Sequence, residues 1–328
     1  MESFDALYAI AARDGRGEAL FGNSIELARP VYERTLIGNG YPIAHLEFPL
    51  LGNPCFDILS VHSRVTPGAR FAPGAGFGYQ GMFDWFAGIL EAGERAGCGI
   101  ELDISAGETE RAGVYLQQRS CHHLVAPFLE SVGETGRTQS YLDVLARMPE
   151  GWHVWYAGVH PGRPGSPVRM DCFVDAGLKD AYATNVSLLE NDLAACGFEA
   201  TGPALHGLAR PLLDSPFGLE LQFDVMPDGS LGPTLGISAA FSLRTAHAMR
   251  PLFEEGGPAA ELLGAVERLE LADDRWRRIP DAMISKLVPA DGTVLALYCV
   301  PTFVKLRMRD GRPLDAKAYL QAGASTLG

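Results

Sequence analysis

The sequence is poor in basic residues for its size. Its 27 Lys and Arg are outnumbered by 40 Asp and Glu, which gives a formal net charge of −13 and an isoelectric point near 5.1. Because nucleic acids are bound by basic surfaces, this balance argues against nucleic acid as the main partner. It leaves room for a small local cluster of cations.

Long apolar runs and closely spaced cysteines are missing as well. No uninterrupted apolar run approaches the roughly 20 residues that a membrane helix needs. The N-terminal MESFDALYAIAARDG carries acids where a signal peptide would be basic. The 6 cysteines are scattered without a CxxC pair, as is typical of reduced thiols. We therefore expect a cytoplasmic protein without a membrane segment, and a monomer.

Common catalytic motifs are few. No HExxH occurs, so the sequence predicts no metal site held by the protein, and without GxSxG a serine hydrolase of the usual kind is excluded. Gly76, Gly78 and Gly81 stand at GxGxxG spacing, which could indicate an NAD-dependent oxidoreductase. The strand before them alternates in polarity and is separated from them by a long gap. A dinucleotide-binding strand is apolar throughout and leads directly into its glycines, so we discount this interpretation.

The chain does contain a recurring unit of one helical region followed by two strands. Helical regions are expected over 24–37, 79–97, 123–133 with 140–148, 181–198 ending at Gly197, and 246–271. Strand pairs are expected over 43–50 and 56–65, 99–105 and 112–118, 152–161 and 168–175, 219–229 and 234–242, and 293–300 and 302–311. A last helix is expected over 314–323.

The paired strands alternate between apolar and polar residues, so each has one apolar face and one polar face. The turns between them are too short for parallel crossovers, which predicts antiparallel hairpins. The apolar faces must be covered by the helices. The polar faces then meet water in an open sheet, or surround a wet lumen if the ten strands close into a barrel. Because no composition shift marks a linker, we expect one domain over residues 1–328.

This α+β pattern resembles the ABBA prenyltransferases, in which five helix–strand–strand units close into a ten-stranded antiparallel barrel with helices outside. Within that fold the chain looks most like the cyanobactin-type peptide prenyltransferases, which modify ribosomally made peptides. The resemblance lies in Glu47 within HLEFPL, the strand FDILSVHSRV, the hairpin WYAGVHPGRPGSPVRM and the ending VKLRMRDGRPLDAKAYL. It implies transfer of a prenyl group, dimethylallyl or longer, from its diphosphate to a side chain of a peptide or amino acid.

The resemblance also implies that the barrel lumen binds the prenyl diphosphate. Fixed positive charge there would stabilise the diphosphate as it leaves. The candidates for this role are Arg64, Arg169, Lys305 and Arg307, with His62 beside Arg64. Tyr115 and Tyr298 could shield an allyl cation through cation–π attraction, and Mg²⁺ is expected to arrive with the diphosphate. The alternatives are cations paired with neighbouring acids, and tyrosines that only pack.

Glu47 is the candidate to orient the acceptor or take its proton, unless it forms only a salt bridge. The residues expected to contact the acceptor are Asp103, Asp171, Glu220, Gln222 and Asp224. Because buried carboxylates need a cation or a hydrogen-bond donor, we expect an acceptor with positive charge or N–H groups, such as a guanidinium, indole or imidazole. The main alternative function is a non-catalytic barrel that binds a peptide or a small ligand.

Overall fold

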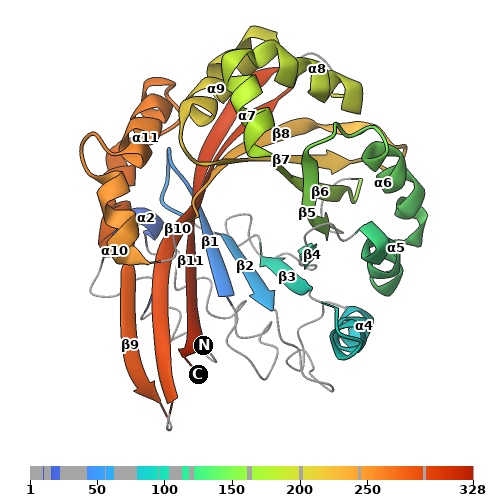
Figure 1. Ribbon diagram of the computed structural model, residues 1–328, viewed down its shortest axis with the longest axis horizontal. Helices are drawn as coiled ribbons and strands as arrows, with labels where there is room; N and C mark the ends of the chain where they lie inside the picture. The colour runs from blue at the N-terminus through green and yellow to red at the C-terminus, as the bar shows by residue number, and fades with distance from the viewer. Residues whose placement is uncertain are drawn as a thin grey trace.

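Within the part of the chain that the structure describes, eleven β-strands join in one sheet at the centre of the protein (Figure 1). The computed structural model describes residues 10, 16–22, 43–55, 57–62, 80–94, 96–102, 113–117, 122–160, 165–198, 202–242, 245–290 and 293–327. The strands are β1 (Ile43–Pro49), β2 (Asp57–His62), β3 (Gly97–Leu102), β4 (Gly113–Gln117), β5 (Trp152–Val159), β6 (Val168–Val174), β7 (Gly218–Val225), β8 (Leu231–Ala240), β9 (Ile284–Ala290), β10 (Thr293–Arg309) and β11 (Arg312–Leu327).

All of these strands except β9 form a closed antiparallel ring. Each of β1 to β7 pairs with the next strand in the chain, β8 pairs with β10, and β10 pairs with β11. Strand β11 then pairs with β1, from Ala44 opposite Ala322 to Pro49 opposite Lys317, and so closes the ring. The ten-stranded barrel expected from the repeat is confirmed. Closure leaves the ring without an open edge.

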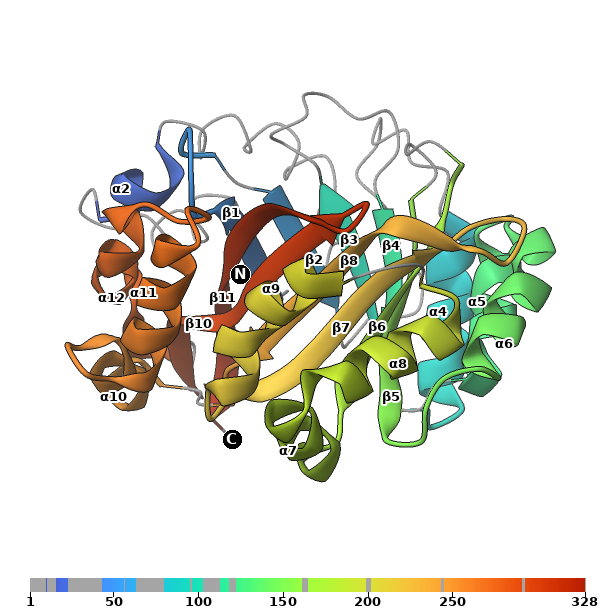
Figure 2. The ribbon, with the colours of Figure 1, turned by 90° about the horizontal axis from the view of Figure 1, so that it is seen from above.

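Helices cover the outside of this barrel (Figure 2). They are α2 (Glu18–Phe21), α4 (Gln80–Glu91), α5 (His122–Ser131), α6 (Thr138–Leu145), α7 (Ala176–Thr184), α8 (Val186–Cys196), α9 (Gly202–Asp214), α10 (Ala246–Met249), α11 (Pro258–Arg268) and α12 (Ile279–Ala282). Gly197 caps α8 with φ 100°, as expected. None of the described helices is long and apolar enough to cross a membrane.

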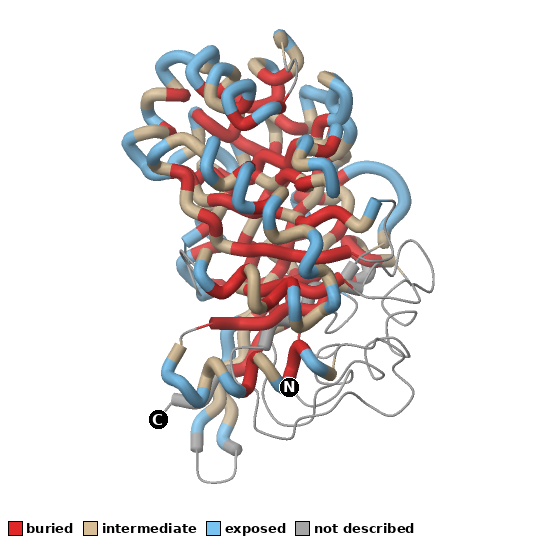
Figure 3. Tube along the Cα trace, turned by 90° about the vertical axis from the view of Figure 1, so that its right-hand side faces the viewer, coloured by how far each residue is buried: buried red, intermediate tan, exposed pale blue. Residues whose placement is uncertain are grey.

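The apolar core lies between the helices and the outer face of the barrel. In α4, the buried Met82, Phe83 and Phe86 recur at helical spacing and face the sheet. On the strands, residues such as Leu221 and Phe223 are buried on the same outer face. Figure 3 shows buried strands beneath helices whose outer turns are exposed. Each such side chain stabilises the fold by about 1.5–3 kcal/mol relative to exposure, and their alternation turns the polar residues into the lumen.

The helices depart from expectation in three places. The region expected over 181–198 is two helices, α7 and α8, separated at Asn185, whose side chain caps α8. Helix α9 was not expected. The region expected over 246–271 is interrupted at Gly256 and Gly257 between a short 3₁₀ turn and α11. The helix expected over 24–37 lies outside the described residues.

The expected hairpin between 293–300 and 302–311 is wrong, because both segments belong to the single long strand β10. Pro301 lies between the two expected strands, and proline cannot donate a ladder hydrogen bond. In the structure it lies at a bulge where β10 changes neighbour. Residues Thr293–Cys299 pair with β9 and residues Phe303–Arg309 pair with β8, so the missing N–H falls between the two pairings.

The helix expected over 314–323 is also wrong, since this segment is part of β11. Alanine and leucine favour helices locally, but pairing with both β10 and β1 decides the structure. Asp310 and Gly311, both with positive φ, form the turn from β10 into β11. Asp-Gly is a strong hairpin signal, and it was the sequence feature that could have revealed this strand. Strand β9, which pairs only with β10 among the described strands, was likewise unexpected.

Candidate functional site

A small polar cavity of about 50 Å³ lies inside the barrel. Its wall comes from the inward faces of β1, β3 to β7, β10 and β11. The lining residues are His45, Glu47, Glu101, Tyr115, Tyr156, Arg169, Asp171, Glu220, Gln222, Phe303, Lys305 and Tyr319. Residues two apart on one strand, such as Arg169 and Asp171, share a face, which is why the alternation in the sequence collects these groups in one place.

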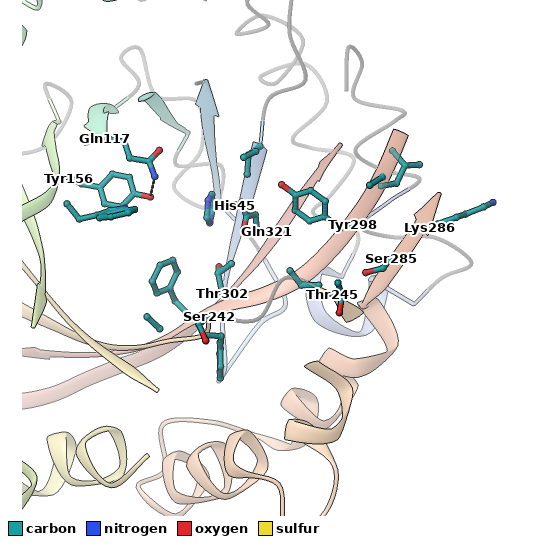
Figure 4. Close-up of a pocket in the computed structure, with 18 of the residues that line it drawn as sticks. His45, Gln117, Tyr156, Ser242, Thr245, Ser285, Lys286, Tyr298, Thr302 and Gln321 are labelled. Atoms are coloured by element: carbon teal, nitrogen blue, oxygen red, sulfur yellow. Dashed lines mark hydrogen bonds between the residues drawn. The ribbon is translucent and has the colours of Figure 1, made fainter. Parts of the chain in front are cut away.

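A wider cavity of about 970 Å³ adjoins the polar one. Figure 4 shows residues that line the wider cavity. The two cavities share His45, Tyr156 and Phe303 in their walls. The aromatic residues of the wider cavity are Trp155, Tyr156, Phe173, Phe241, Tyr298 and Phe303. Strand β9 extends its wall with residues 285–287, whose Leu287 is 62% exposed. A ligand with an apolar body could therefore occupy the wide cavity and present one end to the polar cavity.

Most of the described cationic side chains on the lumen face form ion pairs with acidic residues. Arg169 donates to both oxygens of Asp224, at 2.9 Å from Nε to Oδ1 and 3.3 Å from Nη2 to Oδ2. Arg307 is bonded in the same bidentate manner to Asp315, and the ammonium of Lys317 donates to Glu47. The interpretation that pairs lumen cations with lumen acids thus holds for Arg169.

Lys305 differs from these cations, because it forms no ion pair with any described carboxylate. It is only 7% exposed. Its Nζ donates to Gln222 Oε1 at 3.1 Å and lies 4.7 Å from the centre of the Tyr319 ring, as a cation–π contact. Burial lowers the pKa of Lys305, and the negative charges of Glu47 and Asp171 oppose that effect. A buried cation without its own counter-ion is suited to an anionic ligand.

Glu47 is ionised in this environment. Burial alone would raise its pKa, but the charges of Lys317 and Lys305 and the hydrogen bond from Lys317 outweigh burial and lower the pKa to about 2. On the opposite strand, Tyr319 hydrogen-bonds to Glu47, and burial together with this negative charge raises the pKa of Tyr319 well above its usual value. Glu47 is therefore a fixed negative charge that can accept a hydrogen bond, and a weak base.

Glu220 lies in the opposite electrostatic situation. It is 3% exposed, and its carboxyl group lies against that of Asp171, which is 6% exposed. Burial and the charge of Asp171 raise the pKa of Glu220 well above its usual value. Two carboxylates have no hydrogen between them, so this contact becomes a hydrogen bond only when Glu220 holds a proton.

A Glu220→Gln variant should be more stable than the wild type at about pH 8, because the folded protein no longer has to retain a proton that the unfolded chain releases. The folded pKa of Glu220 is raised, so its contribution to stability is present below the unfolded pKa and is lost as pH rises. The gain from the substitution should therefore shrink toward about pH 4, where Glu220 is neutral in both states. Urea unfolding at several pH values measures it, and a gain independent of pH would contradict the raised pKa.

Tyr115 connects three other groups of the lumen. Its hydroxyl lies 2.7 Å from His160 Nε2, donates to Glu101, and accepts a hydrogen bond of 3.4 Å from Arg169 Nη1. The ring lies against Gly158 on β5 so closely that a Cβ there would overlap it. Tyr115 is thus held in place by both its hydroxyl and its ring.

Gly158→Ala should displace the Tyr115 ring and destabilise the fold by about 1–3 kcal/mol, as overpacking does. Loss of the fixed ring should also loosen the contact between Tyr115 and Arg169. Thermal unfolding checks the first effect, and the tyrosine signals of a proton NMR spectrum check the second. Gly88→Ala is the control, because a Cβ at Gly88 on α4 meets nothing within 4 Å. Equal stability of the two variants would show that the lumen adapts to the extra methyl.

Seven of the residues proposed from the sequence line the polar cavity. They are Glu47, Tyr115, Arg169, Asp171, Glu220, Gln222 and Lys305. Asp224 lies behind Arg169 as its partner, and Tyr298 lines the wider cavity. Arg307 lines neither cavity and is bonded to Asp315. Arg64, Asp103, Gly76, Gly78 and the side chain of His62 lie outside the described part of the chain.

Several residues of the site were not foreseen. Lys317 and Tyr319 were missed because their segment was expected to be a helix, whereas in β11 both face Glu47. Tyr156 on β5 and His160 just after it were missed because nothing in the sequence of this segment shows which of its aromatic residues point inward. Within the described ranges, no group of three or more His, Cys, Asp or Glu residues could hold a metal ion.

Comparison with known proteins shows which solved structures share this fold. No family model matches the chain, and no curated protein matches it. Among solved structures, 5-dimethylallyltryptophan synthase from Streptomyces coelicolor has a TM-score of 0.50 at 12% identity, covering 97% of both chains. A second structure of that enzyme, in complex with DMASPP and Trp, has a TM-score of 0.42 at 13% identity, covering 97% of this chain and 92% of the other. The first similarity shows the fold, which is the barrel that the resemblance implied.

Proposed function

We propose that the protein is a prenyltransferase, which moves a prenyl group, dimethylallyl or longer, from its diphosphate to a side chain of a peptide or an amino acid. The whole chain, residues 1–328, would serve as one catalytic domain. The observation that carries the proposal is Lys305, a buried lysine without a described carboxylate partner, in the polar cavity that adjoins the wide aromatic one. That arrangement suits a ligand with an anionic head and an apolar tail.

The chemistry would begin with cleavage of the bond between the allylic carbon and the diphosphate oxygen. The electron pair leaves with the diphosphate, where Lys305 and Arg169 would stabilise the developing negative charge. The allyl cation would then lie among aromatic rings, which attract it through their faces. Tyr298 and Tyr115 are the proposed shielding residues, and Tyr156 is proposed as a third because it lines both cavities. A nucleophile on the acceptor captures the cation and then loses a proton to the released diphosphate or to water.

Glu47 would orient the acceptor in this reaction. Its pKa of about 2 makes it a poor acceptor of a full proton near neutral pH but a permanent acceptor of a hydrogen bond. Its charge would also stabilise positive charge that develops on the acceptor as the new bond forms. We therefore favour orientation over deprotonation as its role.

Other parts of the donor site remain proposals that follow from the sequence. Arg307 is bonded to Asp315 and lines neither cavity, whereas Lys305 and Arg169 line the polar cavity, so these two are the stronger candidates among the described residues. Arg64 and His62 are proposed on sequence grounds alone. Mg²⁺ would be held by the phosphate oxygens and water, as this ion commonly is. When bound, it would neutralise charge on the leaving diphosphate.

The acceptor is proposed to be a peptide or an amino acid. The Streptomyces coelicolor structure belongs to a dimethylallyltryptophan synthase, whose name supports an amino-acid acceptor. The resemblance of the sequence to cyanobactin-type enzymes supports a peptide. In both cases the acceptor body would occupy the wide cavity, with its polar group directed toward Glu47 and the acids of β6 and β7.

The test is incubation with dimethylallyl diphosphate and a panel of short peptides and free amino acids. We expect diphosphate release and a gain of one prenyl unit in mass on an acceptor bearing N–H groups. A non-catalytic barrel would bind the peptides without releasing diphosphate, and it is the second candidate because so many lumen cations are already ion-paired. Transfer only to flavonoid-like aromatics would keep the activity and overturn the acceptor class.

A further inference from the structure

The carboxyl pair of Asp171 and Glu220 is not used by the donor site or by Glu47. Each other described acid of the lumen face has a hydrogen-bond donor: Asp224 has Arg169, Asp315 has Arg307, Glu47 has Lys317, and Glu101 has Tyr115. Asp171 receives one hydrogen bond, at 2.8 Å from Gln222 to Oδ2. Lys305, whose positive charge acts on Glu220, bonds to Gln222 and not to either carboxyl group. The pair is thus the part of the lumen with the least compensated negative charge.

Two oxygens of this pair are buried without a partner. Glu220 Oε1 and Asp171 Oδ1 accept no hydrogen bond from any described group. Glu220 is 3% and Asp171 6% exposed, so water cannot reach them freely. A buried acceptor without a donor costs about 1–3 kcal/mol, and more when it is charged. A protein that keeps such a pair in a cavity wall either retains a proton between them or meets a ligand that supplies donors.

The position of the pair makes it reachable from the wide cavity. Glu220 on β7 lies opposite Phe173 on β6, and Phe173 lines the wide cavity. Tyr156, opposite Asp171 on β5, belongs to the walls of both cavities. A ligand whose body fills the wide cavity could therefore place a small polar group against the pair.

We propose that Asp171 and Glu220 bind a protonated nitrogen group, an alkylammonium or a guanidinium, carried by the acceptor. This assignment rests on the proposed function, because it identifies which part of the acceptor the barrel recognises. The cation replaces the proton held by Glu220, which is released to solvent, so the charge of the site is unchanged on binding. The groups facing the pair are Lys305, Tyr156, Gln222 and Ser238; only Lys305 among them is cationic.

The experiment is calorimetric binding of three probes with the same body: phenethylamine, phenethylguanidine and phenethyl alcohol. The two cationic probes should bind the wild-type protein at least about tenfold more tightly than the alcohol. Glu220→Gln and Asp171→Asn should each remove that preference and leave alcohol binding unchanged. Asp143→Asn, which removes a charge from the exposed surface of α6, should retain it. Comparable binding of all three probes, or a preference that survives both substitutions, would overturn the proposal.

Proton release gives an independent readout. Heats measured near neutral pH in two buffers of different ionisation enthalpy should show a proton leaving the protein when a cationic probe binds, and none with the alcohol. If no proton is released, the proposed replacement of the Glu220 proton by the cation of the ligand is wrong. A stronger guanidinium signal would indicate an arginine-like acceptor, and a stronger ammonium signal an amino-terminal or lysine-like one; both support the site. Thermal midpoints confirm that each variant is folded.

Donor binding separates this inference from the proposed function. Wild-type protein that binds the cationic probes but neither binds dimethylallyl diphosphate nor releases diphosphate would disprove prenyl transfer and leave the cation site standing. Wild-type protein that transfers a prenyl group but does not prefer the cationic probes would support prenyl transfer and disprove the cation site. Glu220→Gln should not weaken diphosphate binding, since it removes no positive charge.

Discussion

Replacing Lys305 with methionine should weaken binding of dimethylallyl diphosphate by about 10- to 100-fold, because a charge-assisted contact to phosphate contributes about 1.5–3 kcal/mol. Turnover should fall further, since the same charge stabilises the leaving diphosphate more than the intact donor. Methionine retains the length and apolar stem of lysine. Calorimetry with the donor measures affinity, and release of diphosphate under saturating donor measures turnover.

Two variants make the result for Lys305 specific. Lys305→Arg retains the charge and should recover part of the affinity. Lys286→Met removes an exposed lysine of β9 from the wall of the wide cavity. It therefore measures how far loss of any positive charge near the cavity weakens donor binding. If Lys305→Met binds the donor as tightly as Lys286→Met does, Lys305 is not part of the diphosphate site.

Glu47→Gln should reduce turnover by about 10²- to 10³-fold, as does removal of other groups that stabilise charge in a transition state. The amide keeps the size of the side chain but loses the charge. Donor affinity should not fall, because the negatively charged Glu47 contributes no attraction to a diphosphate. If turnover remains within a few-fold of the wild type, Glu47 serves only to hold Lys317.

The pH profile distinguishes the charge of Glu47 from a purely structural role. With a pKa of about 2, Glu47 should remain ionised throughout the range in which the protein is folded, so it should produce no acid limb in the wild-type profile. Lys317→Met removes the ion-pair partner and should raise the pKa of Glu47. Activity of that variant should then decline as pH falls, at pH values where the wild type is still fully active. Identical acid limbs in the two proteins would show that the charge of Glu47 is not required.

Much of the barrel can be predicted from the sequence because its first four strand pairs are local. In most of the strands between β1 and β8, polar and apolar residues alternate, and consecutive strands pair with each other. The same alternation correctly placed Glu47, Arg169 and Lys305 in one cavity. Local periodicity carries this information without any knowledge of distant contacts.

The remainder depends on contacts that local patterns do not contain. Strand β11 is rich in alanine and was assigned to a helix, because its extended form is favoured only by pairing with β1. Lys317 and Glu47 are 270 residues apart in the chain, so no spacing rule joins them. For the same reason the sequence could count the charges of the lumen but could not show that Arg169 and Arg307 are ion-paired and Lys305 is not.

The closure of the ring by β11 has a consequence for synthesis of the protein. The ribosome makes β11 after the other described strands, so the nascent chain has unpaired edges on β1 and β10 until β11 emerges. Open edges of this kind invite pairing with other chains, and pairings between distant segments form slowly. Truncation before Arg312 should therefore yield a protein that aggregates in the cell rather than a soluble, inactive barrel.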